Sequence, residues 1–335
     1  MKILYIPVTK KINEKNIINY VKCFFYDIYI ILKNFSFNRK ATNSTSGYID
    51  AAIHSNAYVF ELPYNYCLIF SKILNLLFDG IFVNWKFTNY RKDKEELNSK
   101  LYKLSKKFKI KKVIIDGTDR SINVIKDEIL DGFDFVIKRE KSKSISSKKF
   151  FTTILPCKLI DYKISRGKEN IDWNKIGNST PNLNPKYDIF FSGQQSSKSR
   201  TELIEFLKSK NFNFFGRAEK SKIPFNEYLA TIYNSSINLA LEGKGEFTFR
   251  HLEILASCSF MICQSSINEL DLPLPLLEGK HFVSFENKDD LLEKINFYLK
   301  NDKVRNDIAL NGRRVLEEHY SPKKHGEFLF NKIFS

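Results

Sequence analysis

Arg250 and Glu253 stand three positions apart in the stretch GEFTFRHLEILASCSFMICQ, residues 245–264. If a helix begins near Thr248, this spacing places both side chains roughly on one face, close to the amino end of the helix. A guanidinium there can pair with a diphosphate, and a carboxylate can accept hydrogen bonds from the vicinal hydroxyls of a ribose. The simpler interpretation is an ion pair on the helix surface. Three apolar neighbours indicate a largely buried helix and favour the first interpretation: Leu252, Ile254 and Leu255.

Three consecutive loops of the second half combine a glycine with a cation after an expected strand. FFSGQQSSKSR contains Gly193 and Arg200, FFGRAEK contains Gly216 and Arg217, and LALEGKGE contains Lys244. Backbone amides at the start of a helix, together with such cations, can hold phosphate. Any one of these loops could simply carry a cation that faces solvent. Three in succession favour a nucleotide site.

Loops of this kind need an open parallel sheet, because such sheets bind ligands outside the carboxyl ends of their strands. Short apolar runs alternate with helical patterns along the chain, which predicts βαβ units and an α/β fold. The strands expected in the second half are 187–193, 212–216, 237–243, 259–264 and 281–285. Those expected in the first half are 3–7, 80–85, 112–116 and 133–138. A helix is expected over 92–109, with an apolar face of Leu97, Leu101, Leu104 and Phe108.

The segment GNSTPNLNPK, residues 177–186, is poor in apolar residues and is the best domain boundary. A chain of 335 residues is long enough for two cores. We therefore predict a Rossmann-like domain over 1–180 and a second over 187–319, each a doubly wound sheet. The chain then ends in helices that are interrupted at Ser321 and Pro322.

The apolar segments and the cysteines indicate the compartment in which the protein works. The start, MKILYIPVTK, is typical of a buried strand and not of a secretory signal, and the longest apolar stretch is broken by charges and proline. Five scattered cysteines without a C-x-x-C pair indicate reduced thiols and no zinc site. These features predict a cytoplasmic protein.

The net charge of +16 is divided unequally between the halves. Residues 1–190 hold 34 Lys and Arg against 19 Asp and Glu, whereas residues 191–335 hold 20 against 19. Basic clusters at 103–112 and 138–149 could attract nucleic acid, an anionic membrane or an acidic substrate, or could only solubilise the protein. We expect the cluster 138–149 to face an anionic bilayer, so that the protein would be peripheral at the inner face of the membrane.

The segment INLALEGKGEFTFRHLEILASCSFMIC, followed by KDDLLEKINFYLKNDKVRNDIALNGRRVLEEHYS, resembles the donor-binding domain of GT-B glycosyltransferases, especially the group 1 and CgeB-like families. The resemblance covers about residues 187–325, and the first half is similar only in outline. It implies two Rossmann-like domains facing a central cleft, with a C-terminal helix, 320–335, that packs back on the first domain. It also implies transfer of a sugar from a nucleotide-sugar donor to a hydroxyl of a glycan or lipid-linked acceptor, in assembly of a cell-surface polysaccharide or lipopolysaccharide.

The resemblance implies a metal-independent hexosyltransferase without a cofactor. Donor-binding residues would be Gly193, Arg200, Gly216, Arg217, Lys244, Thr248, Arg250 and Glu253. Retaining members commonly carry a second glutamate eight positions before the ribose-binding one, but that position here is Gly245, with Glu246 beside it. The stereochemical outcome therefore stays open.

An inverting reaction needs a general base in the first domain to deprotonate the acceptor hydroxyl. The strand end DGTD offers Asp119, the preferred candidate, and Asp116. His54 and His251 are weaker alternatives, and either aspartate could serve only to shape the loop. The D-x-x-D spacing differs from the D-x-D of metal-dependent transferases, so no metal site is predicted.

Two other functions compete with this one. The first is a basic nucleic-acid-binding protein, but its lysine clusters lack a known recognition pattern, so nucleic acid is not an expected partner. The second is a GT-B relic that binds nucleotide without turnover.

Overall fold

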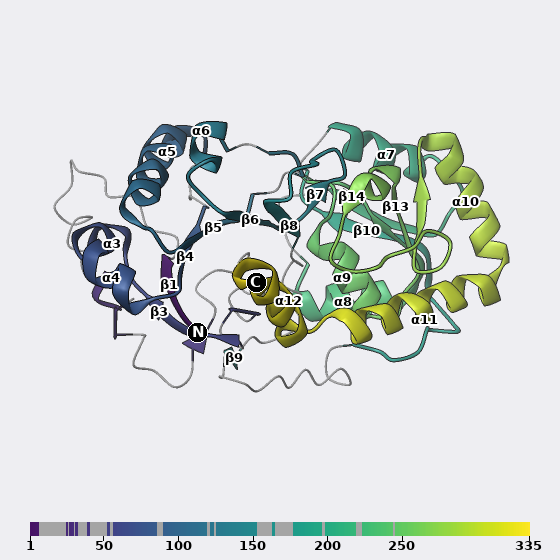
Figure 1. The fold of residues 1–335 in the computed structure, drawn as a ribbon. Helices are drawn as coiled ribbons and strands as arrows, with labels where there is room; N and C mark the ends of the chain where they lie inside the picture. Colours follow the sequence, from purple (N-terminus) through teal and green to yellow (C-terminus); the bar gives the residue numbers. More distant parts are fainter. Residues whose placement is uncertain are drawn as a thin grey trace.

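The computed structural model describes residues 1–6, 25, 27–29, 31–32, 39–40, 52–53, 56–85, 90–118, 121–123, 125–152, 163–164, 177–195, 198–218, 223–243 and 245–335. Within these residues two separate parallel sheets form, and they confirm the two-domain α/β architecture expected from the sequence (Figure 1). No helix in these ranges is both long and apolar enough to cross a bilayer.

The N-terminal sheet has six parallel strands in the order β3-β1-β4-β5-β6-β8. In that order they are Tyr58–Glu61, Lys2–Ile6, Gly80–Asn84, Lys111–Asp116, Phe135–Lys138 and Phe150–Thr152. Four of them, β1, β4, β5 and β6, match expected strands within two residues at each end. The other two, β3 and β8, have four and three residues and were not expected from the sequence.

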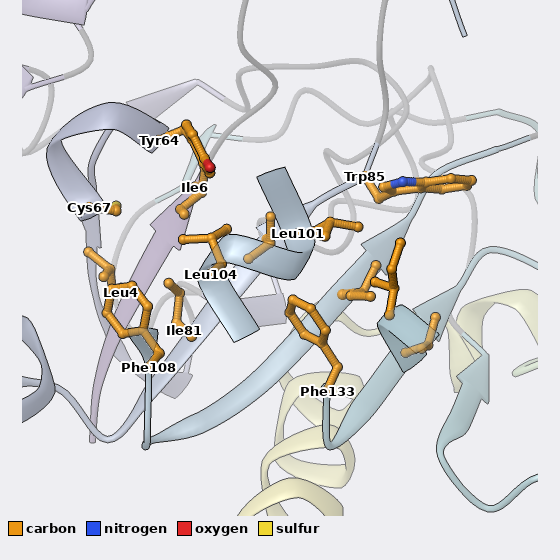
Figure 2. Packing of buried hydrophobic residues seen from close by; sticks show 14 of the residues in the cluster. Leu4, Ile6, Tyr64, Cys67, Ile81, Trp85, Leu101, Leu104, Phe108 and Phe133 are labelled. Atoms are coloured by element: carbon orange, nitrogen blue, oxygen red, sulfur yellow. The ribbon is translucent and has the colours of Figure 1, made fainter. Parts of the chain in front are cut away.

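Helices on one face of this sheet cover an apolar core (Figure 2). They are α3 (Tyr64–Ile69), α4 (Ser71–Leu77), α5 (Tyr90–Lys107) and α6 (Asp127–Leu130). The expected apolar face is confirmed at Leu101 and Leu104 of α5 and at Phe108, which follows its last residue; all three are at most 1% exposed. The side chain of Leu97 lies outside the described part.

The last helix of the chain, α12 (Pro322–Phe334), packs on the other face of the N-terminal sheet. The ring of Phe330 stacks on Phe82 of β4 with 6.0 Å between centroids. Gly326 allows a close approach, because a Cβ there would lie 2.2 Å from the carbonyl oxygen of Ala52. The chain therefore crosses back from the second domain to complete the core of the first.

The C-terminal sheet has five parallel strands in the order β11-β10-β12-β13-β15. In that order they are Phe214–Ala218, Tyr187–Gly193, Ser235–Ala240, Met261–Gln264 and Val283–Phe285, all within three residues of expectation. One core joins the sheet to α8 (Phe225–Tyr233) and α9 (Phe249–Ala256). The core on the opposite face joins it to α7 (Lys198–Lys208) and α10 (Lys288–Lys300). Helix α11 (Asp302–His319) contributes to both cores.

A short antiparallel pairing links the two domains. Strand β7 (Lys141–Ser142) pairs with β14 (Leu270–Asp271), which follows the 3₁₀ helix η2 (Ser265–Glu269). Lys141 forms an ion pair of 3.0 Å with Asp271, and the Lys143 ammonium donates to the carbonyl of Asn268 at 2.5 Å. A second small pairing joins β2 (Arg39–Lys40) to β9 (Lys163–Ile164).

This junction corrects the expectation that the basic cluster 138–149 faces a membrane. Lys138 and Arg139 are only 1% and 6% exposed, because they lie at the end of a buried strand. Lys149 donates to the carbonyl of Leu130 at 3.0 Å. Since Lys141 and Lys143 bind the second domain, most of the cluster holds the protein together and is not free to meet an outside partner.

Candidate nucleotide-binding site

Those predicted donor residues that the structure describes lie at the carboxyl edge of the C-terminal sheet. Strand β10 ends at Gly193, and its last residues run in parallel register with β11, where Ser192 is opposite Arg217 and Phe191 is opposite Gly216. Helix α9 begins at the same edge, after Thr248. Parallel strands place their carboxyl ends together, so the sequence pattern correctly brought these loops to one place.

Arg250, in the first turn of α9, lies directly against the end of β10. Its guanidinium is centred 4.5 Å from the ring of Phe191 and donates to the carbonyl oxygen of Ser192. A Cβ on Gly193 would come within 2.6 Å of the same guanidinium, so glycine leaves the room that Arg250 occupies. The Nε of Arg250 is buried and has no hydrogen-bond partner within the described residues. An anion at this edge would supply the missing acceptor.

Glu253 lies one turn further along α9 and is 5% exposed. The hydroxyl of Tyr228, on α8, donates to its Oε2 at 2.9 Å. Burial raises the pKa of Tyr228, Arg250 partly offsets this, and the nearby Glu253 carboxylate raises it further, so the phenol stays protonated and remains a donor. The ring packs against Phe190 with centroids 5.8 Å apart, which fixes its position. Glu253 is thereby held by one oxygen, and its other oxygen can accept hydrogen bonds from a ligand.

Arg200, also predicted to bind the donor, contacts the backbone around the site. It is 5% exposed and donates to three backbone carbonyls, those of Gln194, Leu241 and Glu242. Burial and the nearby Arg250 lower its pKa to about 10. Its guanidinium ties the loop after β10 to the end of β12, and so it shapes the anion site.

The remaining donor candidates differ in what the structure shows of them. Gly216 lies against the ring of Phe214, which would come within 2.0 Å of a Cβ at that position. Arg217 is half-buried on β11. Lys244 lies outside the described residues.

The start of α9 is closed by a reciprocal cap. The Thr248 amide donates to Nδ1 of His251 at 3.0 Å, and His251 is 1% exposed. Burial lowers the pKa of His251 to about 3, so the ring is neutral at physiological pH. Because it is enclosed by the cap, His251 holds the helix start in place and is a poor candidate for a general base. His54 lies outside the described residues.

Asp116, the second candidate base, is occupied by a buried ion pair. Its Oδ2 is 2.5 Å from the ammonium of Lys138, and both side chains are at most 1% exposed. Its Oδ1 accepts the amide of Thr118 at 3.0 Å. With both oxygens engaged, Asp116 joins β5 to β6 and is not placed to take a proton from an acceptor. Asp119, the preferred candidate, lies outside the described residues.

Two carboxylates where the loop before α9 meets the first domain were not singled out as site residues. Glu246 accepts from the hydroxyl of Ser121 at 2.9 Å, and its second oxygen is buried without a partner in the described structure. Glu140, fully buried, accepts the amide of Phe247 at 3.0 Å and a hydrogen bond from Arg139 at 2.8 Å. Burial raises the pKa of Glu140, Arg139 opposes this, and Glu246 adds to it. Glu140 and Glu246 come close together only because the two domains contact each other. A local sequence pattern could not reveal this pair.

The sequence pattern did not reveal Tyr228 either, because a tyrosine within an apolar helix is typical of a core position.

Within the described ranges, no group of three or more His, Cys, Asp or Glu side chains is arranged to hold a metal ion. A cavity of about 360 Å³ lies elsewhere, at the domain junction, between Lys143 and Phe282.

Comparison with known proteins agrees with this picture. Residues 199–329 match the family described as glycosyl transferase-like. No curated protein matches the chain in sequence. The chain is similar in fold to an alpha-glucosyltransferase in complex with UDP-glucose and DNA containing an abasic site, with 12% identity, complete coverage of both chains and a TM-score of 0.55.

Two further solved structures are also similar. Anabaena HepE in complex with UDP and glucose is 11% identical, with 99% of this chain and 98% of that chain covered and a TM-score of 0.52. TarM is 11% identical, with 79% and 57% covered and a TM-score of 0.50. At these identities the likeness concerns the fold, and it confirms the GT-B-like architecture expected from the sequence.

Proposed function

We propose that the protein transfers a sugar from a nucleotide-sugar donor, with UDP as the nucleotide, because residues 199–329 match the glycosyl transferase-like family and the fold is GT-B-like. The observation that carries the proposal is the pair Arg250 and Glu253 at the carboxyl edge of the parallel sheet. Arg250 is poised over the end of β10, and Glu253 is oriented by Tyr228. The choice of UDP follows from the similar structures, in which a glucosyltransferase holds UDP-glucose and HepE holds UDP.

In this proposal the diphosphate lies beside Ser192 and Gly193, where Arg250 pairs with it. Arg217 adds positive charge at the same edge, and Thr248 presents the amino end of α9. Lys244 is a further donor candidate because of its sequence position alone. Glu253 accepts from the ribose hydroxyls. As the bond between sugar and diphosphate breaks, negative charge develops on the leaving phosphate, and a guanidinium held in place stabilises it without reorganisation. The reaction would therefore proceed without a metal ion or another cofactor.

The acceptor would bind through the N-terminal domain. We propose a hydroxyl of a glycan or of a lipid-linked acceptor, in assembly of a surface polysaccharide or lipopolysaccharide. Asp119 is the proposed general base: it takes the hydroxyl proton while the acceptor oxygen bonds to the anomeric carbon and the nucleoside diphosphate leaves with the bonding electrons. That sequence of events gives inversion, and its support is the position of Asp119 after strand β5.

A DNA acceptor is the second candidate. One observation favours it: the first 190 residues carry 34 basic against 19 acidic side chains, and the similar alpha-glucosyltransferase was solved with DNA. Transfer to duplex DNA that carries a hydroxymethylated base, assayed beside glycan acceptors, separates the two. Salt-sensitive binding without transfer would indicate only nonspecific attraction to phosphates.

Donor binding is tested by thermal unfolding in the presence of nucleotide sugars. We expect at least one UDP-sugar to stabilise the protein, by about 2.7 kcal/mol when its concentration is 100 times Kd. UMP should stabilise less at equal concentration, because it lacks the second phosphate that Arg250 is proposed to bind. If no diphosphate sugar raises the melting temperature at millimolar concentration, the proposed donor site is wrong. A turnover assay with the stabilising sugar then distinguishes an enzyme from a relic that only binds.

Tyr228→Phe tests whether the tyrosine orients Glu253. Loss of one hydrogen bond of about 1 kcal/mol should weaken UDP binding roughly five-fold, because the carboxylate is no longer fixed toward the ribose. A UDP analogue without the ribose hydroxyls should bind both proteins equally. Tyr233→Phe, on the same helix, is the matched control. Equal losses for UDP and the analogue would mean that Tyr228 supports only the fold.

A further inference from the structure

Helix α4 turns an apolar face toward solvent. Leu76 is 86% exposed and Ile69, at the end of α3, is 70% exposed. Three more large apolar side chains beside them are about half exposed: Phe70, Ile73 and Leu77. Single exposed leucines are normal on a protein surface, but a contiguous group of this size marks an interaction site.

The opposite face of α4 is firmly anchored, so this exposure is not the result of a poorly packed helix. Leu74 of α4 and Cys67 of α3 lie in the core beneath the helices, where Figure 2 shows Cys67 beside Leu4. The Asn75 side chain donates to the carbonyl of Lys107 at 3.0 Å and accepts the amide of Lys109 at 2.8 Å. Helix α4 is therefore joined to the end of α5, and its apolar residues are held outward.

The same contact brings positive charge to the apolar group. Because Asn75 binds the backbone at Lys107 and Lys109, the last turn of α5 runs beside α4, and Lys106, Lys107 and Lys109 are all exposed there. Lys72, also exposed, stands among the apolar residues on α4 itself. The nearby Asp79 accepts the amide of Lys2 at 2.7 Å.

We propose that this surface docks the protein on an anionic lipid bilayer. It comprises Ile69, Phe70, Lys72, Ile73, Leu76 and Leu77, with Lys106, Lys107 and Lys109, and is called the α4 face. Bulky apolar side chains among lysines suit the boundary between lipid headgroups and acyl chains. The apolar side chains insert between the lipids, and the lysines contact anionic headgroups. A protein partner fits less well, because lysine is depleted at protein interfaces.

The α4 face lies at the outer end of the N-terminal domain, away from the C-terminal domain (Figure 1). Docking there leaves the nucleotide site on α9 untouched, so the inference is independent of the proposed donor chemistry. It also moves the membrane contact away from residues 138–149, where Lys141 and Lys143 bind the second domain and Lys149 binds the carbonyl of Leu130.

The test is sedimentation of the full protein with vesicles of phosphatidylcholine alone or with 30% phosphatidylserine added. We expect binding to the anionic vesicles that falls as salt rises, and little binding to the neutral ones. Ile73→Ser with Leu76→Ser should reduce the vesicle-bound fraction at least ten-fold. Lys106→Glu and Lys107→Glu should each weaken binding about five-fold or more, because a lysine near an anionic surface contributes on that order.

Two controls keep the test decisive. Leu183→Ser removes an apolar side chain that is 75% exposed in the domain boundary, and Lys148→Glu reverses an exposed charge within 138–149; neither should change vesicle binding. Equal binding of the α4 face variants and wild type would overturn the proposal. A second outcome would also overturn it: the wild type does not bind vesicles but self-associates, and the double variant Ile73→Ser with Leu76→Ser abolishes the self-association. The α4 face would then be a protein interface. Because these positions are exposed, unchanged melting temperatures are expected for all variants.

Discussion

Replacing Lys138 with methionine is expected to lower the free energy of unfolding by about 3–5 kcal/mol, because it leaves the buried Asp116 carboxylate without its counterion. The two charged groups are 2.5 Å apart and at most 1% exposed, so water cannot replace the lost partner. Chemical denaturation of the wild type and the variant measures this loss. Lys148→Met, at an exposed position of the same segment, is the control and should cost less than 0.5 kcal/mol.

The double variant Asp116→Val with Lys138→Met separates structure from catalysis. Replacing both members of a buried pair by apolar residues is often nearly neutral, so the double variant should recover most of the lost stability. If Asp116 only holds β5 to β6, the double variant also keeps its transfer activity, whereas Asp119→Asn loses it. A stable but inactive double variant, together with normal activity of Asp119→Asn, would make Asp116 the base.

Arg250→Ala should weaken binding of a nucleoside diphosphate sugar by about 10- to 150-fold, which corresponds to roughly 1.5–3 kcal/mol for a charge-assisted contact. The guanidinium lies next to the proposed position of the diphosphate. Its Nε is buried and has no hydrogen-bond partner in the described structure. Calorimetric titration with UDP measures the affinity. Arg314→Ala, which removes an exposed arginine of α11, is the matched control and should bind as the wild type does.

Glu253→Gln belongs to the same experiment. It keeps the size of the side chain and removes the charge that accepts from the ribose, so a smaller loss than that of Arg250→Ala is expected. Because Arg250 also contacts Phe191 and Ser192, the melting temperature of each variant is measured without ligand. Unchanged UDP affinity in both folded variants would exclude these residues from the donor site.

Periodicity and strand ends predicted most of the architecture. Leu101, Leu104 and Phe108 recur at helical spacing, and all three are buried. Gly193 and Arg250 were both predicted at the carboxyl edge of one parallel sheet, and the guanidinium of Arg250 does lie against the strand that Gly193 ends. These predictions succeed because they depend on local pattern and on a general property of parallel sheets.

The contacts that the sequence did not reveal concern partners distant in sequence. Asp116 follows a strand, as catalytic carboxylates often do, but its ion pair comes from Lys138 on the neighbouring strand. Arg200 carries a charge suited to phosphate, and it donates to the carbonyls of Leu241 and Glu242, about 40 residues away. The lysines of 138–149 resembled a free basic surface, but Lys138 and Lys149 bind within the first domain, and Lys141 binds the second. Sequence spacing alone carries no information on such contacts.

A crystal structure with UDP bound tests the central claim most directly. The account predicts the diphosphate beside Ser192 and Gly193 within hydrogen-bond distance of the Arg250 guanidinium, and the ribose hydroxyls on the oxygen of Glu253 that Tyr228 does not hold. UDP bound away from α9, for example in the cavity between Lys143 and Phe282, would contradict it.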